Sequence, residues 1–339
     1  MKNTSPVELH KEQSRKLCPS MRWDGKTPLT QWRVACQEKL SELLGMDTFA
    51  PCDADLRILK EDLVNGNRRI HFLVQTEVGY YVNCHLLLPS AAPEGKLPLC
   101  ACLQGHVSGA HITVGIDKFA HDKTYIEHEC DFGVQAVKHG FAALAIEQRG
   151  FGENGGNTEE GWTQCQHPAM GALLMGRTLI GERVWDVQRV IDAVTTYFAD
   201  VITMDGSLLL GESGGGTATY YTACFEDRFS AYMPIVALCN YYDSIMEISH
   251  CVCNYVPGIA RYFDMGDLAV MTAPKKVVFV SATEDEWFPL AGAKKAYARV
   301  EEIYRAAGAE NHCAMVLGEG GHRFYAGLAW PVVLNMLEK

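Results

Sequence analysis

The sequence predicts an α/β fold built on a doubly wound, mostly parallel sheet with antiparallel strands on its N-terminal side. From residue 97 onward, apolar runs without polar alternation, such as 208–210, alternate with segments of helical periodicity. Strands that are buried on both faces of a parallel sheet have this composition. Before residue 97, strand-like runs are separated by turn residues, as in antiparallel hairpins.

Size and charge limit the classes of function. The 339 residues suffice for one large domain or two ordinary ones, and 48% hydrophobic with 21% charged residues is typical of soluble globular proteins. The net charge of -11 argues against nucleic acid or an anionic membrane as the main partner. No run reaches the ~20 apolar residues of a membrane helix. The N-terminus lacks an apolar signal-peptide core, so we expect a cytoplasmic protein. The oligomeric state is left open, a homo-oligomer included.

The 13 cysteines indicate free thiols in a reducing compartment, because several, such as Cys84 and Cys100, fall in predicted core strands. Cys251 and Cys253 form a Cys-x-Cys pair, which is too tight for the usual zinc-ribbon spacing. No second pair stands at a matching distance. This spacing argues against a structural metal.

Four histidines occupy one stretch of the chain, His106, His111, His121 and His128. Their wide spacing and the lack of an H-E-x-x-H pattern favour packing or solvent-exposed histidines over a zinc cluster. We therefore expect no metal site and no cofactor.

The predicted domain organisation is a helical extension over 1–54, packed on a single domain of 55–339. Within the extension, residues 29–44 carry apolar side chains at helical spacing, and Gly45 follows as the expected C-cap. Strands are expected at 56–59, 69–74, 80–88, 99–103, 141–146, 208–210, 232–238, 276–281 and 312–317. Helices are expected at 132–139, 181–198, 217–224 and 291–307, with a final helix after His322 that Pro331 disturbs. We expect residues 239–272 to be irregular.

The sequence Gly211-Glu212-Ser213-Gly214-Gly215 fits the pattern G-x-S-x-G and follows an apolar strand. Glycines two positions before and after the serine let strand and helix approach closely, so Ser213 can occupy a strained turn with its hydroxyl exposed. The N–H of Gly214 would then lie at a helix N-terminus, which favours an oxyanion. An ordinary glycine-rich turn is the alternative.

Polar residues follow several predicted strands, and chemistry in such sheets sits at the carboxyl ends of the strands. Ser213, then Asp285, then His322 follow three of them, in the chain order of one class of serine-hydrolase triad. His322 would act as the base, and Asp285 would hold the imidazole in the required tautomer. Asp285 competes with Glu284 and Glu286, and all three could instead form a solvent-exposed acidic loop.

Further candidates follow from the same rule. The backbone N–H groups of Gly214 and His106 are expected to bind the oxyanion. Four side chains are candidates for substrate contact, namely Gln104, Arg149, Glu212 and Trp287. For Arg149 a turn anchored by a structural ion pair is an equal alternative, and Trp287 could simply belong to the core.

On these residues the chain resembles the α/β-hydrolase superfamily, and more narrowly the acetyl xylan esterase-like branch near the cephalosporin-C deacetylase and dienelactone hydrolase groups. The matching segments are 103–106, 147–152, 176–178, 183–186, 211–215 and 253–258, together with Asp285 four residues before Pro289 and the pair Gly321-His322. The resemblance covers roughly residues 55–339. Many relatives have His-Gly where this chain has Gln104-Gly105, a change that keeps the backbone donor and alters the polarity of the pocket.

The resemblance implies a serine carboxylesterase that acts on small acyl esters, often acetyl groups on sugars. It assigns Ser213 as nucleophile, Asp285 as acid and His322 as base, with His106 and Gly214 as oxyanion donors. Two other classes remain alternatives: a peptidase of the prolyl-oligopeptidase type, and a non-catalytic hydrolase-fold binding protein. The long segments 106–130, 153–180 and 239–272 are expected to shape specificity.

Overall fold

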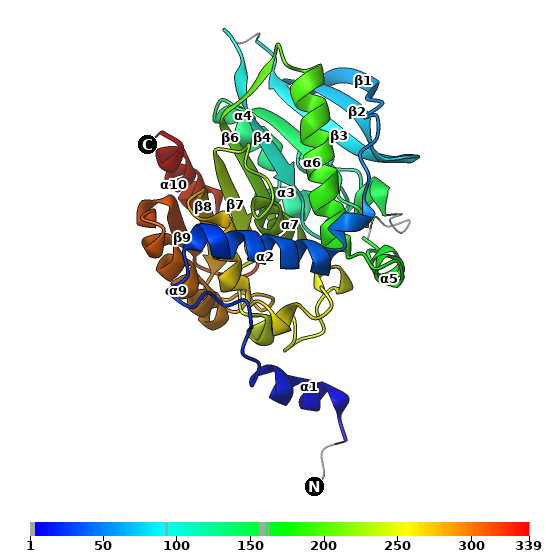
Figure 1. Ribbon diagram of the computed structural model, residues 1–339. Helices are drawn as coiled ribbons and strands as arrows, with labels where there is room; N and C mark the ends of the chain where they lie inside the picture. Colours follow the sequence, from blue (N-terminus) through cyan, green and yellow to red (C-terminus); the bar gives the residue numbers. More distant parts are fainter. Residues whose placement is uncertain (1–3, 92–93, 156–160, 162, 339) are drawn as a thin grey trace.

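One nine-stranded sheet runs through the protein in the computed structural model, which describes residues 4–91, 94–155, 161 and 163–338 (Figure 1). The strands are β1 (Arg57–Val64), β2 (Asn67–Glu77), β3 (Tyr80–Pro89), β4 (Leu97–Leu103), β5 (Ala142–Ile146), β6 (Ile202–Glu212), β7 (Ala231–Ile235), β8 (Lys276–Ala282) and β9 (Cys313–Gly318). Their order across the sheet is β1-β2-β3-β5-β4-β6-β7-β8-β9. The strands from β4 to β9 pair in parallel, whereas β1, β2 and β3 pair antiparallel and join the rest through an antiparallel β3–β5 pair. The predicted sheet is confirmed.

Helices cover both faces of this sheet, and α1 alone among the described helices extends away from it (Figure 1). The helices are α1 (Pro6–Ser14), α2 (Leu29–Leu44), α3 (Asp122–Glu127), α4 (Phe132–Lys138), α5 (Gln166–Leu174), α6 (Leu179–Tyr197), α7 (Gly214–Ala223), α8 (Ala269–Thr272), α9 (Leu290–Ala306) and α10 (Ala326–Glu338). In β6, Leu209 packs in the core beneath α6 and α7, while Leu208 and Leu210 pack in the core beneath α4 and α10. Successive side chains of a strand point to opposite faces, which explains why this run has no polar alternation.

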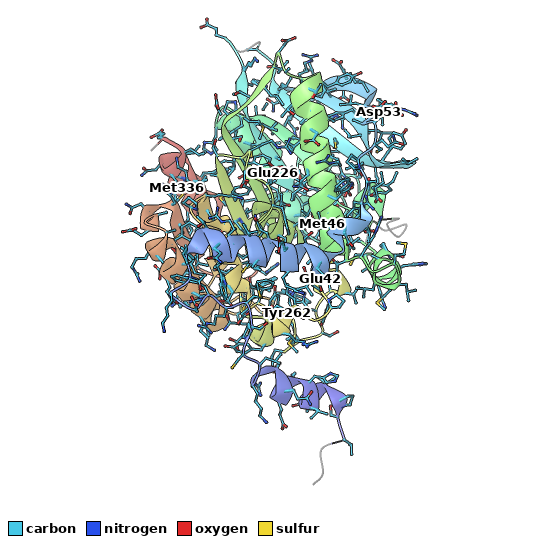
Figure 2. All side chains as sticks on the ribbon, viewed as in Figure 1. Glu42, Met46, Asp53, Glu226, Tyr262 and Met336 are labelled. Carbon is cyan, nitrogen blue, oxygen red and sulfur yellow. The ribbon has the colours of Figure 1, made fainter. Side chains whose placement is uncertain are left out.

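The N-terminal part packs on the first of these cores through α2. Cys36, Leu40 and Leu44 are buried there, and Gly45 ends the helix in the left-handed conformation (φ 73°), as its position predicted. Met46 directly follows and packs against the same core (Figure 2). Helix α1, which we did not predict, projects away from the sheet in Figure 1 and pairs with Glu247 through Lys11 at 2.9 Å.

Several predicted boundaries differ from the structure, two of them for clear local reasons. The strand predicted over 232–238 ends at Ile235, because Val236 has a positive φ of 43° and leaves the extended conformation. The helix predicted from residue 217 begins already at Gly214, directly after the turn at Ser213. Residues 239–272, expected to be irregular, form short 3₁₀ turns and the four-residue helix α8. Among the described helices, none is both long and apolar enough to cross a membrane.

Candidate active site

Ser213 occupies the strained turn between β6 and α7. Its φ of 52° and ψ of -116° lie outside the regions that residues with a Cβ ordinarily adopt. The turn is held from both sides, since the Ser213 N–H donates to the Ile235 carbonyl at 2.8 Å and the Ser213 carbonyl accepts from the Thr217 N–H at 2.8 Å. At Gly215, a Cβ would overlap the carbonyl oxygen of Leu103, so a larger residue there would push β4 and α7 apart.

His322 and Asp285 lie in the loops after β9 and β8. Nδ1 of His322 is 2.9 Å from Oδ2 of Asp285. The other carboxylate oxygen, Oδ1, accepts from the backbone N–H groups of Trp287 at 2.8 Å and Phe288 at 2.9 Å. These three hydrogen bonds fix the carboxylate of Asp285. The contact uses Nδ1 of His322, so the other imidazole nitrogen, Nε2, does not bind this carboxylate.

The neighbouring acids differ from Asp285 in burial. Asp285 is 5% exposed, whereas Glu284 and Glu286 are both exposed on the loop. Of these three acids, Asp285 is the one that lies within hydrogen-bond distance of His322 in the described part of the chain. The alternative assignment to Glu284 receives no support from this geometry.

Ser213 and His322 line the same cavity, which has a volume of about 530 Å³. The described residues around it are Gly105, His106, Val107, Tyr125, His128, Cys130, Glu212, Ser213, Ser249, His250, Cys251, Trp287, His322 and Arg323. The sequence analysis named Ser213, His322, His106, Glu212 and Trp287 among these. It expected segments 106–130 and 239–272 to shape specificity, but it named no substrate-contacting side chain of α3 or of the loop after β7, because distance along the chain does not show which side chains converge.

The predicted oxyanion donors flank Ser213. Gly214 is the first residue of α7, where a backbone N–H has no carbonyl of its own helix to bind. The loop after β4 passes close by, since a Cβ on Gly105 would lie 3.3 Å from Cβ of Ser213. The ring of His106 packs over Gly214, where a Cβ would lie 2.9 Å from Cε1. This arrangement can present two N–H groups to an oxygen bound beside Ser213.

Gln104 does not line the cavity among the described residues but supports the loop that does. It is buried, and its Nε2 donates to Oε1 of Glu147. Oε2 of Glu147 accepts from the Ala110 N–H at 2.9 Å, so this carboxyl joins both ends of the loop. Burial raises the pKa of Glu147 to about 7.

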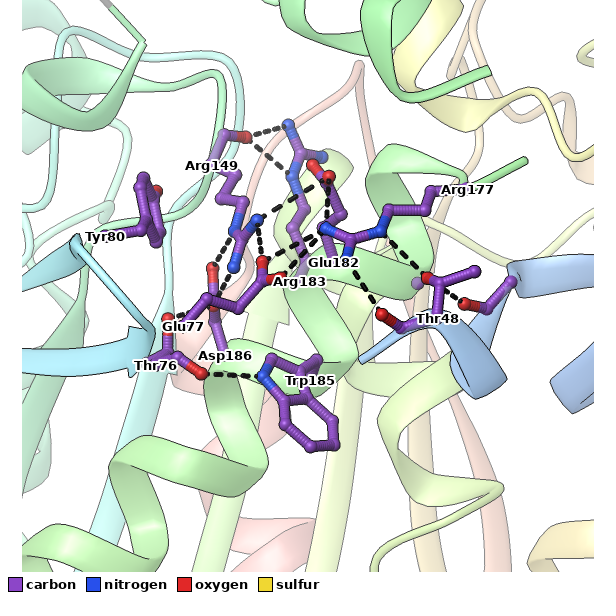
Figure 3. A network of polar contacts seen from close by, with 12 residues as sticks. Thr48, Thr76, Glu77, Tyr80, Arg149, Arg177, Glu182, Arg183, Trp185 and Asp186 are labelled. Atoms are coloured by element: carbon purple, nitrogen blue, oxygen red, sulfur yellow. Dashed lines mark hydrogen bonds and ion pairs between the residues drawn. The ribbon is translucent and has the colours of Figure 1, made fainter. Parts of the chain in front are cut away.

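Arg149 also lies away from the cavity, in a network of buried charges (Figure 3). Its guanidinium pairs with Asp186 at 2.7 Å and with Glu77 at 2.6 Å, and it lies 4.1 Å from the centre of the Tyr80 ring. Its carbonyl accepts from Arg183 at 2.9 and 3.0 Å. Of the two predicted roles, this geometry favours the structural ion pair.

Glu212 and Trp287 do border the cavity. Glu212 is buried, and its Oε2 accepts from Sγ of Cys130 at 3.2 Å. Burial raises its pKa, with His322 as the principal opposing influence. Trp287 is 45% exposed and so presents an aromatic surface at the opening rather than a core side chain.

The four histidines considered for a metal cluster separate in the structure. His111 is buried, with Nε2 2.9 Å from Oδ2 of Asp122. His106 instead lies beside three cysteines, Cys165, Cys251 and Cys253, and one ligand atom from each of the four lies within 4.8 Å of the others. Of this cluster, only the Cys251-x-Cys253 pair is recognisable in the sequence, because His106 and Cys165 lie far from it along the chain.

Comparison with known proteins by sequence finds a relative of this chain. No profile of a known protein family matches the chain. A Bacillus subtilis (strain 168) protein named "Putative hydrolase YtaP" is 24% identical over 235 residues, which are 68% of this chain and 74% of that protein.

Two solved structures share the architecture. One is a Bacteroides fragilis NCTC 9343 protein named "putative acetyl xylan esterase", which superimposes with a TM-score of 0.75 at 14% identity. The superposition covers 93% of this chain and 83% of that one. A glucuronoyl esterase from Solibacter usitatus superimposes with a TM-score of 0.68 at 14% identity, and the superposition covers 96% of this chain and 99% of that one. The chain therefore has the α/β-hydrolase fold, and the predicted resemblance is confirmed as a structural likeness.

Proposed function

We propose that the protein is a serine carboxylesterase that removes small acyl groups, acetyl above all, from carbohydrates. The observation that carries this proposal is the meeting of Ser213, in its strained turn, with His322 in one cavity, where Asp285 lies 2.9 Å behind the imidazole. A serine hydroxyl needs such a base, because the alcohol is a poor nucleophile while it keeps its proton.

In the proposed mechanism, Oγ of Ser213 attacks the ester carbonyl while Nε2 of His322 takes its proton. Asp285 accepts the Nδ1–H bond and stabilises the imidazolium. The N–H groups of Gly214 and His106 bind the oxyanion of the tetrahedral intermediate, each contributing about 3–4 kcal/mol to the lowering of the barrier. His322 then returns the proton to the leaving alcohol. Water, activated by the same imidazole, releases the acyl group from Ser213.

The substrate class rests on the cavity and on the relatives. A volume of about 530 Å³ falls within the ~300–1,000 Å³ of small-molecule sites, which suits an acyl group with part of a saccharide. The half-exposed Trp287 offers an aromatic face to the C–H face of a sugar ring. Esterases named for carbohydrate substrates share the fold, which adds to the case for a saccharide ester.

Two serines that line the cavity allow a matched test. Ser213 stands in the turn, whereas Ser249 is exposed on the loop after β7. We expect Ser213→Ala to lower kcat on short acyl esters by about 10⁴-fold or more, and Ser249→Ala to leave it within a few-fold. A fluorophosphonate should label the wild type and the Ser249 variant but not the Ser213 variant. Undiminished turnover by Ser213→Ala would refute the mechanism.

A substrate panel tests the specificity. Acetylated, methyl-esterified and feruloylated saccharides should be compared by kcat/KM, and we expect the acetylated compounds to be preferred. Labelling of Ser213 with cleavage of aminoacyl anilides but not of acetyl esters would replace the esterase by a peptidase. Absence of labelling in the folded protein would favour a non-catalytic binding protein.

A further inference from the structure

Four side chains with metal-binding atoms meet beside the cavity although they come from three separate parts of the chain. His106 follows β4, and Cys165 directly precedes α5. Cys251 directly precedes the 3₁₀ turn Val252–Asn254, and Cys253 is the middle residue of that turn. Nε2 of His106 lies 3.2 Å from Sγ of Cys253 and 3.8 Å from Sγ of Cys165. Sγ of Cys251 lies 2.7 Å from that of Cys165 and 3.3 Å from that of Cys253.

Three of these four distances lie within about 0.5 Å of those in a tetrahedral zinc site, and the Cys165–Cys251 distance is about 1 Å shorter. With Zn–S of about 2.3 Å and Zn–N of about 2.0–2.1 Å, a regular tetrahedron separates two sulfurs by about 3.8 Å and a sulfur from a nitrogen by about 3.6 Å. The cluster reaches this geometry if Cys165 and Cys251 move apart by roughly 1 Å and the contacts of Cys253 lengthen by roughly 0.5 Å. We propose that His106, Cys165, Cys251 and Cys253 bind one zinc ion in a closed, four-ligand structural site.

The choice of metal follows from the donor set. Three thiolates and one imidazole are soft and borderline donors, which favour zinc over magnesium or calcium, whose ligands are oxygens. Four protein ligands leave no open position for water, as in structural rather than catalytic zinc sites. This inference replaces the expectation of no metal, which rested on spacing along the chain. The four proposed ligands come close together only in the folded chain.

The surroundings suit the charge of the occupied site. Three thiolates, a neutral imidazole and Zn²⁺ sum to one negative charge, and buried charges need compensation. Arg183 is 1% exposed, and its Nη1 has no hydrogen-bond partner among the described residues. Its guanidinium lies 3.9 Å from the centre of the Phe151 ring, which in turn lies 4.5 Å from the His106 ring.

Zinc binding requires the three cysteines to be deprotonated, because the thiolate rather than the thiol is the form that binds the metal. On binding, the protons of the three thiols are released to solvent.

Zinc would join the loop after β4 to α5 and to the 251–253 turn. The ligands are separated by 59 residues between His106 and Cys165 and by 147 between His106 and Cys253. Closing such long loops costs chain entropy, which metal binding would offset in the folded state. Because the His106 ring packs over Gly214, the metal would also hold the loop that carries the proposed oxyanion donor.

The test measures metal rather than activity. Protein produced with zinc and purified under reducing conditions should contain about one zinc per chain by mass spectrometry of the metal. We expect Cys253→Ala and Cys165→Ala to reduce this content to near zero. Cys18→Ala changes an exposed cysteine outside the cluster and should retain it. Ser213→Ala should retain it as well, so the zinc site and the esterase proposal stand or fall separately.

A second measurement covers variants that do not fold. Wild-type protein freed of metal with a chelator and reloaded with Co²⁺ should show thiolate-to-cobalt charge-transfer bands and the intense visible bands of tetrahedral cobalt. Its melting temperature should fall on chelation and recover with zinc. Folded wild type that takes up neither ion would overturn the proposal. So would a thiol count two below the 13 cysteines of the sequence, which would indicate a Cys165–Cys251 disulfide instead.

Discussion

Nδ1 of His322 lies 2.9 Å from Oδ2 of Asp285, although the two residues are 37 positions apart in the chain. The contact joins the loops after two adjacent parallel strands, β8 and β9. Parallel strands end at the same edge of a sheet, so residues that follow them can meet without any local sequence signal.

Replacing Asp285 tests this contact. In Asp285→Asn the amide can no longer accept from Nδ1–H as a carboxylate does, so the imidazole loses its tautomer and its charge stabilisation. We expect kcat on an acetyl ester to fall by about 10⁴-fold with little change in fold by circular dichroism. Glu284→Gln, at the exposed neighbouring acid, is the control and should keep wild-type kcat. The reverse pattern would transfer the role to Glu284.

Adding one methyl group at Gly215 tests the close approach of β4 and α7. The new Cβ would overlap the Leu103 carbonyl, and neither backbone can move freely. We expect Gly215→Ala to lower the free energy of unfolding by about 1–3 kcal/mol or more in urea titrations. Gly171→Ala in α5 meets no heavy atom within 4 Å, and it should raise stability by roughly 0.5–1 kcal/mol. Equal effects of the two substitutions would contradict the packing described.

The ion pairs of Arg149 should matter for stability rather than for substrate binding. Arg149→Ala leaves the 2% exposed carboxylate of Asp186 without its cation, so the free energy of unfolding should fall by about 3–5 kcal/mol. Arg68→Ala removes a pair with Glu61 whose side chains are 51% and 46% exposed, and it should cost no more than about 1 kcal/mol. A raised KM with unchanged stability in Arg149→Ala would instead place this residue at the substrate.

Glu147 should make stability depend on pH. Burial raises its pKa from 4.5 to about 7, and Glu153 adds to this, while the Ala110 N–H and Lys118 oppose it. The folded protein therefore keeps the proton up to about pH 7, whereas the unfolded chain loses it near pH 4.5. Stability from this group is complete below pH 4.5 and is lost as pH rises toward 7 and beyond.

The difference in unfolding free energy between wild type and Glu147→Gln isolates this contribution, because other titrating groups act on both proteins. We expect the free energy of unfolding of wild type, relative to that of the variant, to fall by about 3 kcal/mol between about pH 4 and pH 8. Denaturant unfolding of both proteins at the two pH values measures it. A difference that does not change with pH would show that Glu147 is ionised in the folded protein throughout.

The sequence alone was sufficient to predict most of the sheet, and it named the residues that we propose as the triad. Apolar runs mark buried strands because both faces of a parallel sheet are covered, and the glycines around Ser213 mark a turn that larger residues cannot enter. It was weaker for α1, whose residues are mostly exposed, and for β1, whose exposed first residues carry no burial pattern.

Only the tertiary structure decided which polar residues share a space. It placed Arg149 among buried carboxylates and Gln104 beneath its loop, both away from the cavity, and it brought Cys165 within 2.7 Å of Cys251. Periodicity along a chain reports which face of a helix or strand is buried. It does not report which distant loops meet, since that depends on the order and direction of the strands that carry them.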